Sequence, residues 1–155
     1  MYFIGVDPGK SGGYALLDSK GKIVLVSKFE SWKDVRKKIR LYRPEIKSCA
    51  IEKVASKSAQ GVKSVFTFGM NYGGWLAFLE LTNISHALIP PNRWQRMFLG
   101  SFPKGESKAR SLDFINRRFP YLQLKKTQHG ISDAICLALY ALVLDRRIIG
   151  KHLNG

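Results

Sequence analysis

The chain opens with the stretch YFIGVDPG (residues 2–9), an apolar run that Asp7 closes and a Pro-Gly pair follows. This pattern is typical of a strand that ends in a tight turn. Glu52 closes a second apolar run, and Asp133 opens a third. A carboxylate beside buried apolar residues is costly unless a cation offsets its desolvation. We therefore interpret these three acids as candidate ligands of a divalent metal ion.

The balance of charges points to a polyanionic partner. The 155 residues include 26 Lys and Arg against 11 Asp and Glu, a formal net charge of +15. A positive charge of this size favours nucleic acid over an acidic membrane surface. Solubility alone, the alternative explanation, does not call for so large a charge. The length predicts a single domain over residues 1–155.

The cysteines and the hydropathy pattern indicate a soluble intracellular protein. Cys49 and Cys136 lie inside apolar runs without metal-ligand spacing, so we expect reduced, buried thiols. A disulfide between them is the less favoured alternative. No basic segment precedes the first strand pattern, and no apolar run reaches the ~20 residues of a membrane span. We therefore expect neither a signal peptide nor a transmembrane helix.

Hydrophobic periodicity predicts alternating strands and helices. Three strand patterns open the chain, and the later strands alternate with helices, of which the first is N-capped by Ser31. This order predicts an α/β fold with helices on both faces of one sheet. The expected strands are 2–7, 14–18, 23–29, 46–52 and 87–90, and the expected helices are 32–42, 62–81, 91–99, 108–119 and 131–144. We expect loops at 53–61 and 100–107, and a basic tail after 144.

The turn after the first strand looks like a phosphate-binding P-loop but departs from that motif. Gly9-Lys10-Ser11 would require a glycine at position 4, where the chain has Ile4. Pro8 also removes a backbone N–H that such a loop would direct at phosphate. The sequence therefore disfavours ATP or GTP binding here. Asp7 is better placed to face the crevice where α/β sheets bind ligands.

The three acids can converge if the strands that end at Asp7 and Glu52 are neighbours. Asp133, at a helix start, could then approach from a third side. Two Mg²⁺ ions, or Mn²⁺ in their place, held by such carboxylates can polarise a phosphodiester, activate water and stabilise the leaving oxygen. Taken singly, the acids have simpler explanations as a turn cap, a salt-bridge partner and a helix-start charge. Those explanations fit the three together less well.

Three short motifs resemble the landmarks of RuvC-type Holliday junction resolvases. They are IGVDPG (4–9) with Gly13-Tyr14, AIEKV (50–54) and SDA (132–134), and their order and spacing match over most of the chain. The resemblance is greatest to the phage-encoded branch. It implies an RNase H-like, mixed five-stranded sheet. It also implies a homodimer that nicks four-way DNA junctions by metal-assisted hydrolysis, in the cytoplasm of a bacterial or phage-infected cell.

Two positions depart from the family pattern. The resemblance implies a fourth metal-site residue three positions before Asp133, where this chain has Gly130. His129 would share a helix face with Asp133, and we expect it to act as a ligand or an acid/base group. A solvent-facing loop histidine is the alternative. Ala55 stands where bacterial members have an aromatic wedge, which leads us to expect weak sequence preference and activity on other branched DNAs.

Basic residues flank the predicted site. We expect DNA contacts from Lys10, Lys53, Lys57, Lys63, Arg93, Arg96, Lys104, Lys108 and Arg110. Residues 104–108 resemble the family's lysine-bearing segment, so Lys108 is expected to neutralise charge in the transition state. Any one of these residues could instead belong to a solvated helix face.

The helix at 62–81 is the predicted dimer surface, because its apolar residues exceed one amphipathic face. They are Val65, Phe66, Phe68, Met70, Trp75, Leu76 and Phe78. Gly69, Gly73 and Gly74 would allow close backbone approach. A helix that serves only the core is the alternative. The rival functions are a nuclease for RNA–DNA hybrids, a non-catalytic junction-binding protein, and a sugar-kinase- or actin-like ATPase, which would need a second such domain.

Overall fold

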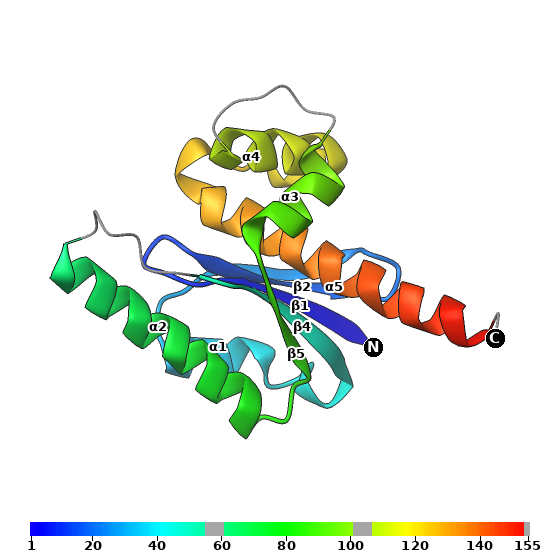
Figure 1. The fold of residues 1–155 in the computed structure, drawn as a ribbon, viewed down its shortest axis with the longest axis horizontal. Coiled ribbons are helices and arrows are strands. Elements are labelled where there is room, and N and C mark those ends of the chain that lie inside the picture. Colours follow the sequence, from blue (N-terminus) through cyan, green and yellow to red (C-terminus); the bar gives the residue numbers. More distant parts are fainter. Residues whose placement is uncertain (55–60, 101–106, 154–155) are drawn as a thin grey trace.

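The computed structural model describes the backbone of residues 1–54, 61–100 and 107–153, and the side chains of residues 1–54, 61–100 and 109–146. Five strands form one sheet in the order β3-β2-β1-β4-β5 (Figure 1). The central strand β1 pairs antiparallel with β2 and parallel with β4, and β4 pairs parallel with β5. The strands are β1 (Tyr2–Asp7), β2 (Gly13–Asp18), β3 (Ile23–Lys28), β4 (Ile46–Glu52) and β5 (His86–Ile89).

Helices cover both faces of this sheet. On one side lie α1 (Trp32–Ile39) and α2 (Val62–Leu81), and on the other lie α3 (Pro91–Leu99), α4 (Ser107–Arg118) and α5 (His129–Leu153). Three short 3₁₀ turns, at Arg43–Glu45, Pro120–Leu122 and Lys126–Gln128, complete the described elements. The predicted fold class, an α/β fold with a mixed five-stranded sheet and helices on both faces, is confirmed.

Two predicted helices differ from the structure by two residues or more at an end, and α4 is displaced by one residue. The first helix ends at Ile39 rather than at residue 42. Pro44 has no N–H to bond the Arg40 carbonyl, so the α-helix cannot continue past it, and a 3₁₀ turn begins at Arg43. The last helix begins at His129, two residues earlier than expected, and continues to Leu153, so the predicted basic tail is helical. Ser31 does N-cap the first helix, since its side chain accepts a hydrogen bond from the Asp34 amide.

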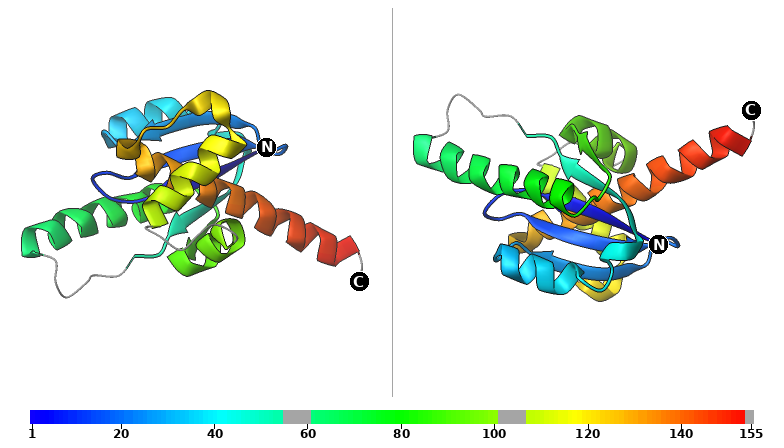
Figure 2. Two further views of the ribbon diagram at one scale, coloured as in Figure 1. Left: turned by 90° about the horizontal axis from the view of Figure 1, so that it is seen from above. Right: turned by 90° about the horizontal axis from the view of Figure 1, so that it is seen from below.

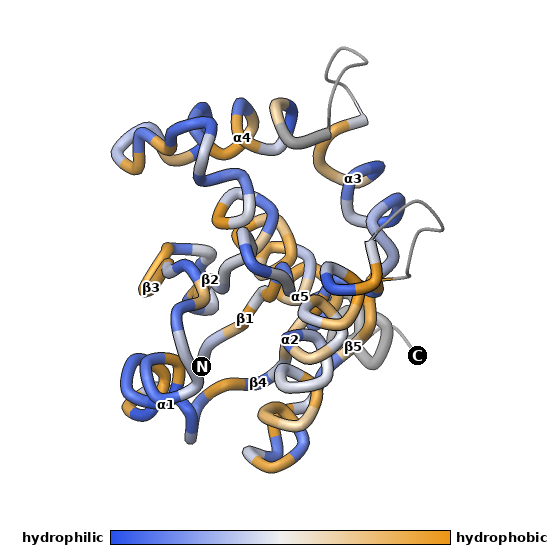
Figure 3. The backbone as a smooth tube through the Cα atoms, turned by 90° about the vertical axis from the view of Figure 1, so that its left-hand side faces the viewer, coloured by the Kyte–Doolittle hydropathy of each residue, from blue (hydrophilic) through white to orange (hydrophobic). Residues whose placement is uncertain are grey.

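The core is divided by the sheet into two clusters. One contains most of α5 together with Trp94 of α3 and Ile115 of α4. The other packs α1 and α2 against the opposite face and includes Tyr14 and Trp75. In Figure 3, α5 is largely apolar where it lies beside β1, whereas polar and apolar residues alternate along α1 and α4. This difference arises because α5 is buried on most sides, whereas α1 and α4 are each buried on one side.

Gly5, in the middle of β1, allows α5 to lie directly against the central strand. A side chain at this position would overlap the carbonyl oxygen of Ala134 and the amide nitrogen of Ala138. A second close backbone contact lies at the start of α5, where Gly12 and Gly130 form a parallel β-bridge. These two contacts fix the distance of the first turns of α5 from β1 and from the turn that follows it.

The apolar residues of α2 divide between core and surface. Trp75 and Leu79 are buried, whereas Phe66 and Met70 are exposed. Gly74 packs under the Trp32 indole, but Gly69 and Gly73 face open space. Among the described residues, one of these three glycines, Gly74, is closely packed, and the group that approaches its backbone is a side chain. Figure 2 shows that α2 and α5 extend past the sheet in different directions.

In the described part of the chain one helical segment, Lys126–Arg146, is long and apolar enough to cross a membrane. This corrects the expectation that no apolar run reaches such a length. However, 67% of its most apolar stretch is buried inside the protein, and packing against the sheet accounts for this apolar character. Cys49 and Cys136 are both free and buried, as the sequence predicts.

The Gly5 contact makes a stability prediction. Gly5→Ala should lower the free energy of unfolding by about 3 kcal/mol or more, because neither β1 nor the α5 backbone can move away without repacking the core. Urea denaturation followed by circular dichroism measures the change. Leu41→Ala is the control, since this side chain is 77% exposed and its truncation should change the free energy of unfolding by no more than about 0.5 kcal/mol. Equal effects of the two changes would contradict this packing.

Candidate metal centre

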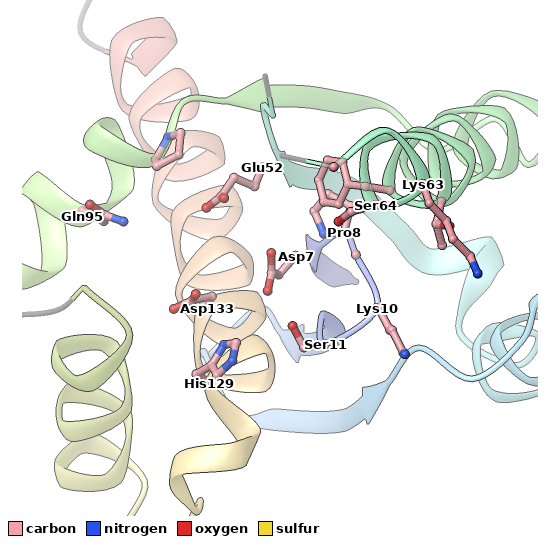
Figure 4. A pocket seen from close by; sticks show the side chains of 15 residues that line it. Asp7, Pro8, Lys10, Ser11, Glu52, Lys63, Ser64, Gln95, His129 and Asp133 are labelled. Atoms are coloured by element: carbon pink, nitrogen blue, oxygen red, sulfur yellow. The ribbon is translucent and has the colours of Figure 1, made fainter. Parts of the chain in front are cut away.

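A pocket of about 970 Å³ lies at the end of the sheet where β1 and β4 finish. Asp7, Glu52, His129 and Asp133 all line it, and Figure 4 shows them around a common space. The walls also include the glycine-rich turn after β1, the first turns of α2 and part of α3. The four residues selected from the sequence as the metal site therefore share one pocket.

The sheet topology brings Asp7 and Glu52 together. Each is the last residue of its strand, and β1 and β4 are parallel neighbours in which Val6 pairs with Ile51. The carboxyl ends of neighbouring parallel strands meet at one edge of a sheet, the usual ligand site of such folds. Asp133 comes from the first turns of α5, whose position is set by the close contact with β1 at Gly5.

The residue types around the pocket suit a divalent cation, but the side chains lie too far apart to coordinate a single ion. Within the described side chains of residues 1–54, 61–100 and 109–146, no three His, Cys, Asp or Glu residues lie close enough to hold one metal ion. Carboxylates repel one another at short range, so a cation would be needed to draw them together. Three carboxylates and an imidazole around one pocket form the mainly oxygen donor set that Mg²⁺ and Mn²⁺ prefer.

Glu52 is an acid of this pocket with a perturbed pKa. Burial raises its pKa above the ordinary value, and a hydrogen bond from the Trp94 side chain partly lowers it again. In that bond the Trp94 indole Nε1 donates to Glu52 Oε2 over 3.0 Å. Perturbed carboxylates in a pocket are a common property of functional sites.

The turn after Asp7 is held by α2. The Gly9 amide donates a 2.9 Å hydrogen bond to Asn71 Oδ1, and the backbone of Gly9 has a φ of 129°, which favours glycine. Gly9 also packs against the Phe68 ring. Since its N–H is already bonded to Asn71, this turn cannot present the full set of amides that a P-loop requires. The sequence argument against nucleotide binding here is strengthened.

His129 lies in the pocket beside Asp133. It is the first residue of α5, one turn before Asp133, and both line the pocket. A side chain at Gly130 would overlap the backbone oxygen of Ser11, so an acidic residue cannot stand there in this packing. In the first turn of α5 the Ser132 hydroxyl donates a 2.7 Å hydrogen bond to the His129 carbonyl oxygen. The alternative of a loop histidine is wrong, because His129 is helical and only partly exposed.

The predicted DNA-contact residues fall into several groups. Lys10 and Lys63 line the pocket, and Lys53 is exposed just beyond β4. Arg93 and Arg96 line a second cleft, of about 350 Å³. Arg110 is partly buried and donates a hydrogen bond to the Leu99 carbonyl, which gives it a packing contact between α4 and α3. Outside the described residues lie Lys57, Lys104, Ala55 and the side chain of Lys108.

Sequence reasoning missed two residues that hold the site, Trp94 and Asn71. Trp94 follows the Pro90-Pro91 start of a helix, where an indole is indistinguishable from an ordinary core residue. Asn71 lies in a helix that is otherwise mostly apolar, and an isolated amide there was the only available signal. Neither side chain could be assigned to the site without knowing that α2 and α3 flank the same pocket.

Comparisons with known proteins agree at the level of the fold. No protein-family model matches the chain, and no curated protein matches its sequence. Among solved structures, Thermus thermophilus RuvC in complex with a Holliday junction substrate aligns at 15% identity with a TM-score of 0.61, covering 94% of this chain and 96% of that one. T. thermophilus RuvC in a second structure aligns at 17% identity with a TM-score of 0.63, over 94% and 96%.

A viral protein shows the same likeness. Fowlpox virus resolvase, in complex with Holliday junction DNA, aligns at 19% identity with a TM-score of 0.54, covering 93% of this chain and 98% of that one. At these identities the likeness establishes a shared fold. The RuvC-type, RNase H-like fold that the three short motifs predict is therefore confirmed.

The environment of Glu52 predicts a pH-dependent stability in metal-free protein. Because its pKa is raised in the folded state, the ionised form destabilises the fold, and this effect grows as the pH rises above about 4.5 through the folded-state pKa. Glu52→Gln should therefore be more stable than wild type at neutral pH in EDTA, with the difference vanishing near pH 4. Urea denaturation at both pH values tests this. A less stable variant at neutral pH would contradict the sign.

Proposed function

We propose that this protein is a divalent-metal-dependent endonuclease that nicks four-way DNA junctions as a homodimer, through paired phosphodiester hydrolysis. The observation that carries the proposal is the convergence of Asp7, Glu52 and Asp133, from β1, β4 and α5, on one pocket of a RuvC-type fold. The structural neighbours crystallised with Holliday junction DNA support the choice of substrate. We place the protein in the phage-encoded branch, acting in the cytoplasm of a bacterial or phage-infected cell.

In this proposal Asp7, Glu52 and Asp133 hold Mg²⁺, for which Mn²⁺ can substitute, and His129 takes the fourth position. When bound, the metal supplies Lewis-acid chemistry, polarising the scissile phosphodiester and activating water. Glu52 contributes from a carboxylate that Trp94 holds in place. His129 sits one helical turn before Asp133, which suits it either to bind the cation or to transfer a proton.

The basic residues bind and orient the DNA. Lys10 and Lys63 flank the pocket on the turn after β1 and on the first turn of α2, where they can pair with phosphates next to the cleaved bond. Lys53, Arg93 and Arg96 extend the positive surface, and Lys57, Lys104, Lys108 and Arg110 remain proposed contacts. The net charge of +15 supports a binding mode dominated by phosphate contacts.

The homodimer forms through the outer face of α2. Val62, Phe66 and Met70 lie four residues apart along one stripe and are 87%, 68% and 64% exposed. A contiguous exposed apolar stripe on a soluble protein marks an interaction surface. Gly69 and Gly73, beside it, leave room for a second helix to approach closely. A symmetric pair supplies the two active sites that cleavage of two opposing strands requires.

The exchange of one active-site acid tests the nuclease. Asp7→Asn should abolish Mg²⁺-dependent nicking of a synthetic four-way junction, by about 10³-fold or more, while junction binding measured by gel shift persists. Loss of a metal ligand removes the chemistry, whereas phosphate contacts to the lysines remain. The assay is product analysis on a denaturing gel with each strand labelled in turn, and wild type should give paired nicks.

Two controls make this result specific. Asp113→Asn removes the same charge at an exposed residue paired with Arg117, and it should cleave like wild type. An RNA–DNA hybrid duplex of equal length should be cut poorly. Full activity of Asp7→Asn would indicate a protein without this metal chemistry, and preferential hybrid cleavage would indicate a different nuclease of the same fold.

The dimer surface is tested by one charge placed on α2. Phe66→Glu should convert the dimer to a monomer in sedimentation velocity and suppress paired nicking, because two carboxylates would face each other across the two-fold axis. Leu41→Glu introduces the same side chain at another exposed apolar position, one that is 77% exposed beyond α1, and should leave the dimer intact. A wild-type monomer that still resolves junctions would contradict this part of the proposal.

A further inference from the structure

Helix α3 contributes a hydrogen-bond donor to one of the proposed metal ligands. Trp94 is fully buried, and its indole nitrogen donates to Glu52 Oε2 over 3.0 Å. The ring belongs to the core cluster that α3, α4 and α5 form on one face of the sheet. Because tight packing on all sides holds a large ring in one rotamer, the direction of its N–H is fixed before any ligand arrives.

The backbone around α3 places this donor accurately. Glu52 pairs with Ile89 at the end of β5, and the Lys53 amide donates to the Ile89 carbonyl over 2.8 Å. Pro90 and Pro91 follow at once and start α3, whose first turns carry Trp94 back over the end of β4. The Glu52 side chain is therefore held at both ends, by the strand at its Cα and by the indole at its carboxylate.

The hydrogen bond leaves part of the carboxylate available for a cation. It uses one lone pair of Oε2, while Oε1 and the second lone pair of Oε2 remain, and Glu52 lines the pocket with Asp7 and Asp133. A ligand whose rotation is fixed loses less conformational freedom on binding than one that rotates freely. Outer hydrogen bonds of this kind orient metal ligands in proteins generally.

We propose that Trp94 is a positioning residue of the metal centre, whose indole N–H fixes the Glu52 carboxylate in the orientation that binds the divalent cation. This inference rests on the proposed function, since it concerns the same site. It assigns to α3 a role beyond the core.

A second tryptophan shows that a buried indole N–H in this protein does not need a hydrogen-bond acceptor like the one Glu52 gives Trp94. Trp75 is also fully buried, yet its indole nitrogen has no hydrogen-bond partner within the described part of the chain. This fold therefore tolerates a buried indole without a bonded N–H in the cluster on the opposite face. The pairing of Trp94 with Glu52 is accordingly a feature of the site, and Trp75 provides a chemically matched control.

The test compares Trp94→Phe with Trp75→Phe. Both changes keep a buried aromatic ring, and only the first removes a bond to the metal centre. Mn²⁺ binding, followed by the electron paramagnetic resonance signal of free Mn²⁺, should weaken by about 10-fold or more in Trp94→Phe and by less than twofold in Trp75→Phe. Excess Mg²⁺ should restore junction nicking by Trp94→Phe, and metal-free junction binding should be unchanged in both variants.

A measurement on the wild-type protein covers the case in which Trp94→Phe fails to fold. In ¹H–¹⁵N spectra the Trp94 indole resonance should shift on titration with Mg²⁺. The Trp75 indole resonance should shift by only a small fraction of that amount. Variants of Trp32 and Trp75 assign the three indole peaks. An unshifted Trp94 resonance under saturating Mg²⁺ would overturn the inference.

The outcomes separate this inference from the proposed function. If wild type and Trp94→Phe bind Mn²⁺ equally well and both nick junctions, the inference fails and the function stands. If both tryptophan variants lose Mn²⁺ binding to the same extent, the effect is one of core packing and the inference again fails. If wild type itself binds no Mn²⁺, the proposed function and the inference fail together.

Discussion

The backbone of α5 lies against the central strand at Gly5, and the remaining features of the site depend on this contact. Any side chain at Gly5 would overlap the helix at Ala134 and Ala138, so the helix could not come so close. The contact brings Asp133 to the edge of the sheet where Asp7 and Glu52 already end neighbouring strands. A site assembled from three rigid elements can hold its acids in place without a dedicated loop.

The ionised carboxylate of Glu52 destabilises the fold while no cation lies beside it. Burial raises the pKa of Glu52, which shows that the ionised form is disfavoured in the metal-free fold. Two neighbouring helices restrain the pocket: Asn71 of α2 holds the turn after Asp7, and Trp94 of α3 holds Glu52. The same α2 presents an exposed apolar stripe on its outer face, so the proposed dimer surface and the metal centre share one helix.

Much of the fold was predictable because the strands are short apolar runs closed by turn residues, and β4, α2 and α3 have the predicted bounds. The acids were found since each stands at the edge of such a run. The extension of α5 to Leu153 was missed, because a basic segment after an apolar one resembles a tail. Trp94 and Asn71 were missed for another reason. Their roles come from tertiary packing, which places distant segments beside the pocket and leaves no periodic trace in the sequence.

The most direct test is X-ray diffraction at the manganese absorption edge, using crystals grown with Mn²⁺. We expect anomalous density in the pocket, within about 2–2.5 Å of carboxylate oxygens from Asp7, Glu52 and Asp133. The same map would show whether His129 completes the coordination. A pocket without anomalous density under saturating Mn²⁺, or an ion bound elsewhere on the protein, would contradict a metal centre built from these three elements.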